Sequence, residues 1–432
     1  MTPQPPPVIY NLFPRLVGDL STWPEHAARA QKMGFNWIYI NPVHYPGFSG
    51  SLYAVKDFYR LNPLFIPPGE ADPLKALSRS VAAMRDLGLG VMMDLVINHT
   101  AIDSVLAAEH PEWFLRDEAG ALVSPSAIDP ADARNVTVWG DLAELDHEGS
   151  SDREGMWAYW EELIRFFLGL GFDGFRCDAA YKVTPELWTR LIKVARSINP
   201  DALFAAETLG CRLREVKALS GAGFDYLFNS SKYWNFDAPW ALEQHAEFRA
   251  IAPSVAFAES HDTPRLMEET GGLVQVQRQR YLFSAIFSAG VLMPLGFEFG
   301  FRRKLDVVSS SPDDWEETGL DLSPFITQVN QLKLDLEVLG DEGLWEVVSS
   351  LDGPTARLCK HGTRAPGAVL ALINKDWHEP QTASLPAKMA DFLPGDIMQV
   401  RPCRGEAPAA LPADQAAYLL DPAEIVLLYS AR

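Results

Sequence analysis

Cysteine and long apolar runs are both scarce in this chain. Four cysteines occur among 432 residues, and none of them forms a CxxC pair, so a disulfide framework is not predicted. No uninterrupted apolar run reaches the roughly 18 residues that a membrane-spanning helix needs, and the start MTPQPPPVIYNLFPRL lacks the pattern of a secretory signal. These absences favour a reducing compartment, and we expect a cytoplasmic location.

Positive charge is also in short supply. The chain has 37 Lys and Arg against 57 Asp and Glu, which gives a formal net charge of −20. An excess of this size argues against nucleic acid and anionic membrane surfaces as partners. A hydrophobic share of 47% and a charged share of 22% are ordinary for a globular enzyme, and the length suits one large domain with a smaller one.

Short apolar runs alternate with segments of helical periodicity along most of the chain. Repeated alternation implies parallel strands, and eight strand–helix pairs over roughly 340 residues fit an α/β fold with a closed (β/α)₈ TIM barrel. A doubly wound open sheet is the alternative, although no GxGxxG follows the first strand. The predicted strands are 8–13, 35–43, 90–98, 172–179, 203–207, 224–229, 254–260 and 291–297, and the predicted helices are 20–33, 73–87, 153–169, 185–198, 212–219, 237–249, 276–288 and 323–338.

Two stretches depart from this spacing. Residues 100–152 separate the third strand from its helix, and they predict a short inserted domain over the barrel mouth. After about residue 342 the chain changes to short alternating runs (VVSSL, AVLALINKD, EIVLLYS) between Pro and Gly turns, which is typical of a small C-terminal β-sandwich. The predicted domains are therefore the barrel at 1–99 and 153–341, the insertion at 100–152 and the β-sandwich at 342–432.

Polar side chains follow four of the predicted strands where each strand ends. Barrel enzymes carry their catalytic residues at these ends. One polar strand end is usually a helix cap or a loop contact, but four in register are hard to explain by packing alone. The four ends read DLVINH (Asp94, Asn98, His99), GFRCDAAYK (Arg176, Asp178), LFAAET (Glu207) and FAESHD (Glu259, His261, Asp262).

The stretch GFRCDAAYK places two opposite charges inside a strand. Because strand side chains alternate, Arg176 and Asp178 share one face and Cys177 takes the other, where it packs in the core. The pair either fixes local geometry only or keeps a reactive carboxylate ionised. Glycosidic bond cleavage uses such a carboxylate as nucleophile together with a protonated one about 5–5.5 Å away. Glu207 follows apolar residues that would raise its pKa, so it is the predicted acid.

These four segments resemble, in order and approximate spacing, the four short conserved regions of the α-amylase family. The resemblance covers nearly the whole chain and implies the barrel, the insertion and the C-terminal β domain. It also implies that Asp178 is the nucleophile, Glu207 the general acid/base and Asp262 a third carboxylate that grips sugar hydroxyls.

Other matching positions imply contacts with the sugar. His99 and His261 resemble the histidines that hydrogen-bond the sugar, and Arg176 resembles the arginine that orients the nucleophile. Tyr53 in SLYAVKDF resembles the tyrosine that stacks under the sugar, although a tyrosine of the core would look the same in the sequence. Arg265 pairs either with a site carboxylate or with a substrate hydroxyl. The predicted substrate-binding residues are Tyr53, Asp94, His99, Arg176, His261 and Arg265.

The chain departs from the family pattern after the nucleophile. Tyr181 and Lys182 stand where the family often has Lys-His, so acceptor binding is expected to differ. That histidine helps to bind a structural calcium in many members. We therefore predict no metal and no cofactor, with a calcium held by Asn98 and the acidic stretch WGDLAELD as the alternative.

The predicted function is retaining hydrolysis of α-1,4-linked glucan or maltooligosaccharides through a covalent glycosyl-enzyme intermediate. The alternative is transfer of the glycosyl group to a sugar or to phosphate, as in a transglycosylase or a maltosyltransferase of glycogen metabolism. A third reading is a non-catalytic amylase-like scaffold, but such relatives typically lack one or more of the carboxylates. All three carboxylates are present here.

Overall fold

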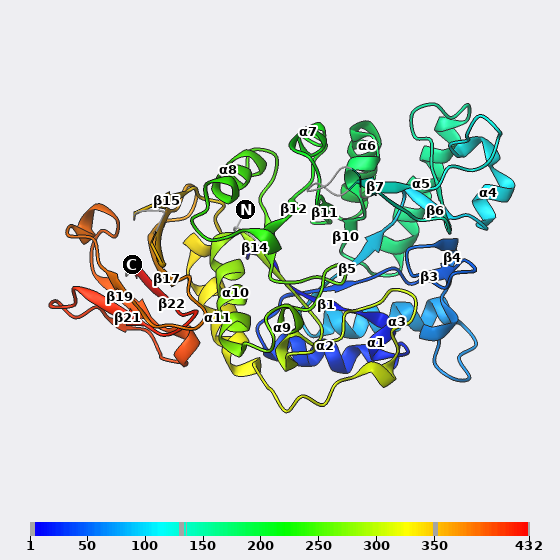
Figure 1. Ribbon diagram of the computed structural model, residues 1–432. Coiled ribbons are helices and arrows are strands. Elements are labelled where there is room, and N and C mark those ends of the chain that lie inside the picture. Colours follow the sequence, from blue (N-terminus) through cyan, green and yellow to red (C-terminus); the bar gives the residue numbers. More distant parts are fainter. Residues whose placement is uncertain (1–4, 129–133, 135, 349–352, 431–432) are drawn as a thin grey trace.

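The computed structural model describes residues 5–128, 134, 136–348 and 353–430, and its centre is a barrel of eight parallel strands (Figure 1). The strand order is β12-β11-β10-β5-β2-β1-β14-β13. A parallel bridge between Leu227 and Ser254 joins the two end strands, so the sheet closes. All eight predicted strands are confirmed: β1 (Val8–Leu12), β2 (Trp37–Ile40), β5 (Gly90–Leu95), β10 (Gly174–Cys177), β11 (Leu203–Glu207), β12 (Tyr226–Phe228), β13 (Val255–Phe257) and β14 (Gly290–Pro294).

Helices follow the strands and cover the outer wall of the barrel. Several begin with proline, which suits the first helical position because that N–H has no partner within the helix. Each predicted helix is present, with ends that shift by a few residues: α2 (Trp23–Lys32), α3 (Pro73–Asp86), α5 (Arg153–Gly169), α6 (Pro185–Ile198), α7 (Leu213–Ala218), α8 (Pro239–Phe248), α10 (Val274–Phe287) and α11 (Ser323–Asp335). The short helices α1 (Pro14–Val17) and α9 (Leu266–Glu269) were not predicted.

Alternate residues of the strands form two separate apolar layers. Outward side chains pack with the helices, and Phe175 and Cys177 of β10 belong to that outer layer. On the same strand the residue between them is Arg176, so the predicted division of faces is confirmed. The inner layer contains Ile9, Tyr39, Met92, Ala205, Phe228, Val255, Phe257 and Leu292.

Residues 99–152 carry a set of short elements between β5 and α5. These are β6 (His99–Ala101), α4 (Val105–Glu109), β7 (Ser126–Ile128), β8 (Val136–Val138) and β9 (Leu142–Glu144). β6 pairs with β9, and β7 pairs with β8. In Figure 1 this part, in cyan, lies at the opposite end of the molecule from the C-terminal strands. An unpredicted antiparallel pair, β3 (His44–Pro46) with β4 (Val55–Leu61), precedes α3.

The C-terminal region is a β domain beside α10 and α11 (Figure 1). Along β17, Val369, Ala371 and Ile373 join the barrel core, whereas Leu370 and Leu372 pack with residues of the β18–β21 pair. Of the run VVSSL, residues 349–351 lie outside the described residues, and the domain boundaries stay predictions. The strands are β15 (Trp345–Val347), β16 (Thr355–His361), β17 (Ala368–Asn374), β18 (Gln381–Ser384), β19 (Ile397–Val400), β20 (Ala409–Ala410), β21 (Ala417–Leu420) and β22 (Ile425–Ser430), with the order β15-β16-β17-β22-β19-β20 in the main sheet.

All four cysteines carry free thiols. Among the described residues, no helix combines the length and the apolar character that crossing a bilayer requires.

Candidate active site

The polar residues that follow the barrel strands gather at one mouth of the barrel around Arg176. Its Nη1 donates to Asp94 Oδ1 at 2.9 Å and to Asp178 Oδ1 at 2.7 Å. Its Nη2 lies 3.8 Å from Asp262 Oδ2. Because these carboxylates lie at or after the ends of three different strands, the guanidinium joins strand ends that are far apart in the sequence.

Asp94 is fully buried at the base of this cluster. Its Oδ2 accepts hydrogen bonds from the hydroxyls of Tyr39 and Tyr53, both at 2.5 Å, and its Oδ1 accepts from Arg176. Burial raises the pKa of Asp94 to about 6, with Arg176 opposing the shift. Since both oxygens are taken by protein donors, these contacts make Asp94 a residue that positions Arg176 and the tyrosines, and they do not favour the predicted contact with substrate.

Asp178 lies at the surface of the cluster, with 13% of its side chain exposed. One oxygen is held by Arg176, and Asn98 Nδ2 lies 3.4 Å from the other. The backbone N–H of Asp178 continues the β10 ladder by donating to the Leu95 carbonyl at 3.0 Å. The carboxylate is thus both anchored to a cation and open to solvent.

Glu207, the last residue of β11, has different surroundings. Its Oε2 accepts from the backbone N–H of Ala179 at 3.0 Å, and its Oε1 accepts from that of Leu209 at 2.6 Å. Burial raises the pKa of Glu207 to about 8, and the negative charges of Asp178 and Asp262 add to the shift against the opposing effect of Arg176. The carboxyl therefore keeps its proton at neutral pH, in contrast to a carboxylate paired with arginine.

Tyr53 and His261 form a stacked pair beside Asp262. Their ring centroids are 5.6 Å apart with an interplanar angle of 6°, and His261 Nε2 lies 2.6 Å from the Tyr53 hydroxyl. The same nitrogen lies 3.1 Å from Asp262 Oδ2, whose side chain is 46% exposed. Burial lowers the pKa of His261 to about 4, so the ring is neutral at pH 7. The role of Tyr53 as a sugar platform stays a prediction.

His99 contacts the backbone of Tyr53. Its Nε2 is 3.2 Å from the Tyr53 carbonyl, and burial lowers its pKa. The two histidines thus hold the backbone and the hydroxyl of the same tyrosine.

Arg265 is buried away from the three predicted catalytic carboxylates. Its Nη1 donates to Glu259 Oε1 at 2.7 Å, its Nη2 to the Leu295 carbonyl at 2.8 Å and its Nε to the Arg303 carbonyl at 3.2 Å. Of the two predicted uses of Arg265, these contacts favour pairing with a carboxylate, Glu259, over binding of substrate. Glu259 also accepts from the Leu266 N–H, so it caps the segment after the strand.

Two polar residues of the site were missed in the sequence. Tyr39 bonds Asp94, and Asn41 Nδ2 donates to the Tyr53 hydroxyl at 3.0 Å. Both belong to the run FNWIYINPV at the end of β2, two residues apart on one face. Arg176 and Asp178 show the same two-residue spacing on one face of a strand. This spacing of polar side chains in the sequence could have identified Tyr39 and Asn41 as site residues.

Tyr181 and Lys182, the departures from the family pattern, both lie beside the site. Tyr181 is partly buried and hydrogen-bonds Cys211, near Glu207. Lys182 Nζ lies 3.4 Å from the Ser126 carbonyl and 3.6 Å from Glu144 Oε1. The segment after Asp178 is therefore fastened to residues of the insertion.

The alternative calcium site around Asn98 stays a prediction. Asn98 Oδ1 is buried without a hydrogen-bond partner, but the described His, Cys, Asp and Glu side chains form no group of three possible ligands beside it. We assign no metal there and derive no step through one.

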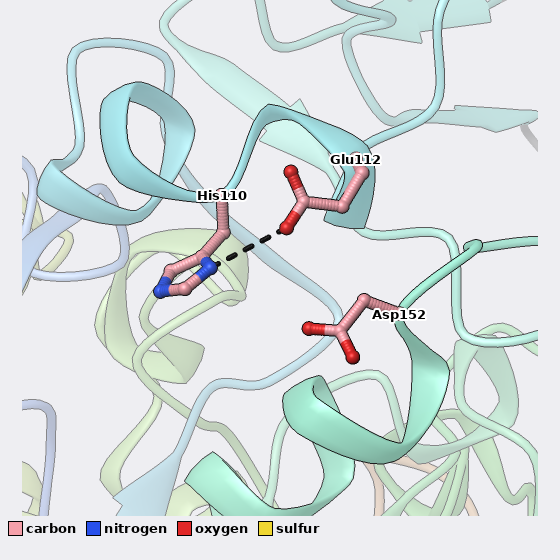
Figure 2. Close-up of side chains that lie close together, drawn as sticks. All are labelled: His110, Glu112 and Asp152. Carbon is pink, nitrogen blue, oxygen red and sulfur yellow. Dashed lines mark hydrogen bonds and ion pairs between the residues drawn. The ribbon is translucent and has the colours of Figure 1, made fainter.

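One group of three possible metal ligands occurs elsewhere among the described residues. Ligand atoms of His110, Glu112 and Asp152 all lie within 4.8 Å of one another (Figure 2). The Asp152 carboxylate already accepts from Trp113 Nε1 at 3.0 Å and from the Gly155 N–H at 3.2 Å, where it caps α5. Both carboxylates are exposed. These contacts explain the cluster as a fastening of the insertion to α5, so we assign no metal to it.

Several known proteins are similar to this chain. A family model described as "Glycogen debranching enzyme, glucanotransferase domain" matches residues 7–125. An alpha-1,4-glucan:maltose-1-phosphate maltosyltransferase of Burkholderia pseudomallei is 25% identical over 409 residues, which cover 92% of this chain and 35% of that protein. Neopullulanase 2 of Thermoactinomyces vulgaris is 26% identical over 328 residues, which cover 69% of this chain and 52% of that protein.

Solved structures give the same fold. The crystal structure of an alpha-amylase from Lactobacillus plantarum matches with a TM-score of 0.75 at 22% identity, covering 98% of this chain and 99% of that one. The chain spans only about a third to a half of the length of the two curated relatives.

Proposed function

We propose that this chain, which belongs to the α-amylase family, cleaves α-1,4-glucosidic bonds with retention of configuration. Glu207 donates its proton to the glycosidic oxygen while Asp178 attacks the anomeric carbon, which forms a covalent glycosyl-enzyme ester and releases the leaving sugar. Glu207, now ionised, takes a proton from the incoming acceptor, whose oxygen displaces Asp178 and restores both groups.

The observation that carries this proposal is the contrast between two carboxyl groups at one mouth. Asp178 forms an ion pair with the Arg176 guanidinium at 2.7 Å, whereas Glu207 accepts hydrogen bonds from two backbone N–H groups and burial raises its pKa to about 8. The backbone N–H of Ala179, the residue after Asp178, bonds Glu207, so the two groups are neighbours. A nucleophile and an acid with opposite protonation in one site is what the retaining mechanism requires.

Asp262 and His261 support the sugar in this proposal. The half-exposed Asp262 carboxylate accepts hydrogen bonds from two ring hydroxyls, and the neutral His261 is hydrogen-bonded beside it. The Tyr53 hydroxyl contacts His261, and the Arg176 guanidinium lies 3.8 Å from Asp262.

Water is the proposed acceptor, and the substrate is an α-1,4-linked glucan or maltooligosaccharide. Transfer to a sugar or to phosphate is the second candidate. The Burkholderia pseudomallei relative, whose match covers 92% of this chain, is an alpha-1,4-glucan:maltose-1-phosphate maltosyltransferase. Tyr181 and Lys182 beside the site also give the acceptor surroundings that differ from the family pattern.

Product analysis tests these alternatives. Purified protein is incubated with maltohexaose, with and without inorganic phosphate, and the products are separated by chromatography and identified by mass. Hydrolysis predicts only shorter maltooligosaccharides, with the α-anomer formed first by NMR. Longer oligosaccharides or a sugar phosphate would establish transfer instead. If Asp178→Asn and the unmodified protein gave the same rate with an aryl maltoside, no faster than the rate without protein, the non-catalytic scaffold would replace both.

We also propose a cytoplasmic location, supported by the four free thiols. A function without metal or cofactor is part of the same proposal.

A further inference from the structure

A surface groove runs between α7 and α8 on the outer wall of the barrel. Its volume is about 1040 Å³, and its lining includes Leu213, Lys217, Trp240, Glu243, Gln244 and Glu247. α7 follows β11 and α8 follows β12, so both helices start at the carboxyl ends of their strands. The groove runs along both helices: Leu213 and Trp240 line its end toward the Glu207 rim, and Ser220 and Ile251 line its other end. The two helices lie next to each other in Figure 1.

Large apolar side chains are exposed at the rim end of this groove. Trp240 is 46% exposed and Leu213 is 38% exposed, and they come from the first turns of the two helices. In contrast, Trp234, a few residues earlier, is almost fully buried. An indole left in water at the edge of a groove is not explained by packing of the core.

Polar groups continue along the groove. Lys217 Nζ pairs with Glu247 Oε2 at 2.8 Å across the two helices, so that their charges cancel. Gln244 Oε1 accepts from Trp234 Nε1 at 2.7 Å, which leaves the amide NH₂ of Gln244 as a donor, and Glu243 is an exposed acceptor. A ligand that suits these groups is uncharged, has an apolar face for the indole and carries many hydroxyls.

We propose that the α7–α8 groove binds a segment of α-glucan outside the catalytic mouth, with Trp240 stacked against one glucose ring. Sugar rings present apolar C–H faces that pack on aromatic side chains, and their hydroxyls pair with carboxylates and amides. The proposal rests on the proposed function and deepens it, because a second contact on the same chain favours long glucans over short oligosaccharides. Residues 208–212 connect Glu207 to the first turn of α7, where Leu213 lines the groove.

Electrophoresis through gels that contain glycogen tests the groove. The parent is Asp178→Asn, which removes turnover during the run, and Trp240→Ala is added to it. We expect the apparent Kd for glycogen to rise at least about fivefold, which corresponds to roughly 1 kcal/mol. Trp240→Tyr, which keeps an aromatic face, should retain most of the affinity. The matched control is Trp377→Ala, since Trp377 is 37% exposed in the C-terminal domain and should leave the Kd unchanged.

The proposal is overturned if Trp240→Ala binds glycogen within about twofold of the parent, or if Trp377→Ala weakens binding equally. A protein as the real occupant of the groove would give the first of these results. Hydrolysis of an aryl maltoside by the unmodified chain reports on the proposed function separately. If the unmodified chain did not hydrolyse the aryl maltoside but still bound glycogen through Trp240, the proposed function would be refuted. The proposal that the groove binds glucan would then still hold.

Discussion

The backbone N–H of Ala179 donates a hydrogen bond to Glu207 Oε2 across 3.0 Å. Ala179 directly follows Asp178 and adopts a left-handed φ of 38°, which turns the chain sharply at the end of β10. Side chains other than glycine rarely adopt this conformation, and it persists where the surroundings enforce it. The turn places an N–H from the nucleophile's own loop on the proposed acid, so the spacing of the two carboxyl groups is built into the backbone.

Replacing Glu207 by Gln removes the proton that the leaving group needs. We expect kcat on maltooligosaccharides to fall about 10²- to 10⁴-fold. A dinitrophenyl maltoside needs no proton for departure, so the first step with this substrate should lose far less. Stopped-flow release of dinitrophenol alongside steady-state rates on maltohexaose measures the difference. Glu162→Gln, at a side chain that is 70% exposed on α5, is the control and should match the unmodified chain.

The pKa of Glu207 sets the alkaline limit of activity. Because the acid must be protonated and its pKa is about 8, kcat/KM should level off just below that pH and decline about tenfold per unit above it. Asp262 raises this pKa by its negative charge, so Asp262→Asn should move the alkaline limb to lower pH even though it slows the reaction. A limb at the same pH in both proteins would contradict the assignment of Glu207 as the acid.

The barrel could be predicted because its strands follow simple rules. Each is apolar, short and separated from the next by a helix, and each catalytic candidate stands where an apolar run ends, as Glu207 does after LFAA. The antiparallel pair of β3 and β4 was missed because its register shifts twice around Tyr45, which breaks the alternation that marks a strand.

Side-chain partners were harder to predict than positions. Asp94 and Arg265 stand at strand ends like the other candidates, yet their oxygens and nitrogens are taken by protein partners such as Tyr39 and Glu259. A sequence shows which residues reach the mouth of a barrel, but whether a charged group faces substrate depends on neighbours from other strands.

Arg176→Met should reduce both stability and activity. Asp94 would be left as a buried charge without its cation, which typically costs about 3–5 kcal/mol. The loss in urea unfolding should be smaller at pH 5 than at pH 8, because Asp94 can then take up a proton. Adding Asp94→Asn should restore much of the stability but none of the activity, since Asp178 still lacks the guanidinium. Recovery of activity in the double variant would argue against a role of Arg176 in the chemistry.

Tyr39 and Tyr53 offer a matched pair of substitutions. Both hydroxyls donate to Asp94 Oδ2 at 2.5 Å, so Tyr39→Phe and Tyr53→Phe should each cost about 1.5–3 kcal/mol of unfolding free energy. Tyr53 alone contacts His261 Nε2 at 2.6 Å. We therefore expect Tyr53→Phe to lower kcat/KM at least about tenfold more than Tyr39→Phe, in line with the loss of one further hydrogen bond. Equal losses in the two variants would show that His261 needs no support from Tyr53.

Lys360 joins the C-terminal domain to the barrel and should make stability depend on pH. Its Nζ is buried and donates to the carbonyls of Ile286, in α10, and Asp341, each at 3.0 Å. Burial lowers its pKa from 10.5 to about 8, so between these values the unfolded chain holds a proton that the folded chain has lost. The free energy of unfolding contributed by this group therefore rises with pH, by about 3 kcal/mol between pH 8 and 10.5.

Lys360→Met removes the titration, so the stability difference between the two proteins in guanidinium unfolding should change by this amount across the window. Lys193→Met, at an exposed position of α6, should show a constant difference. A constant difference for Lys360→Met as well would mean that the ammonium titrates alike in the folded and unfolded chains.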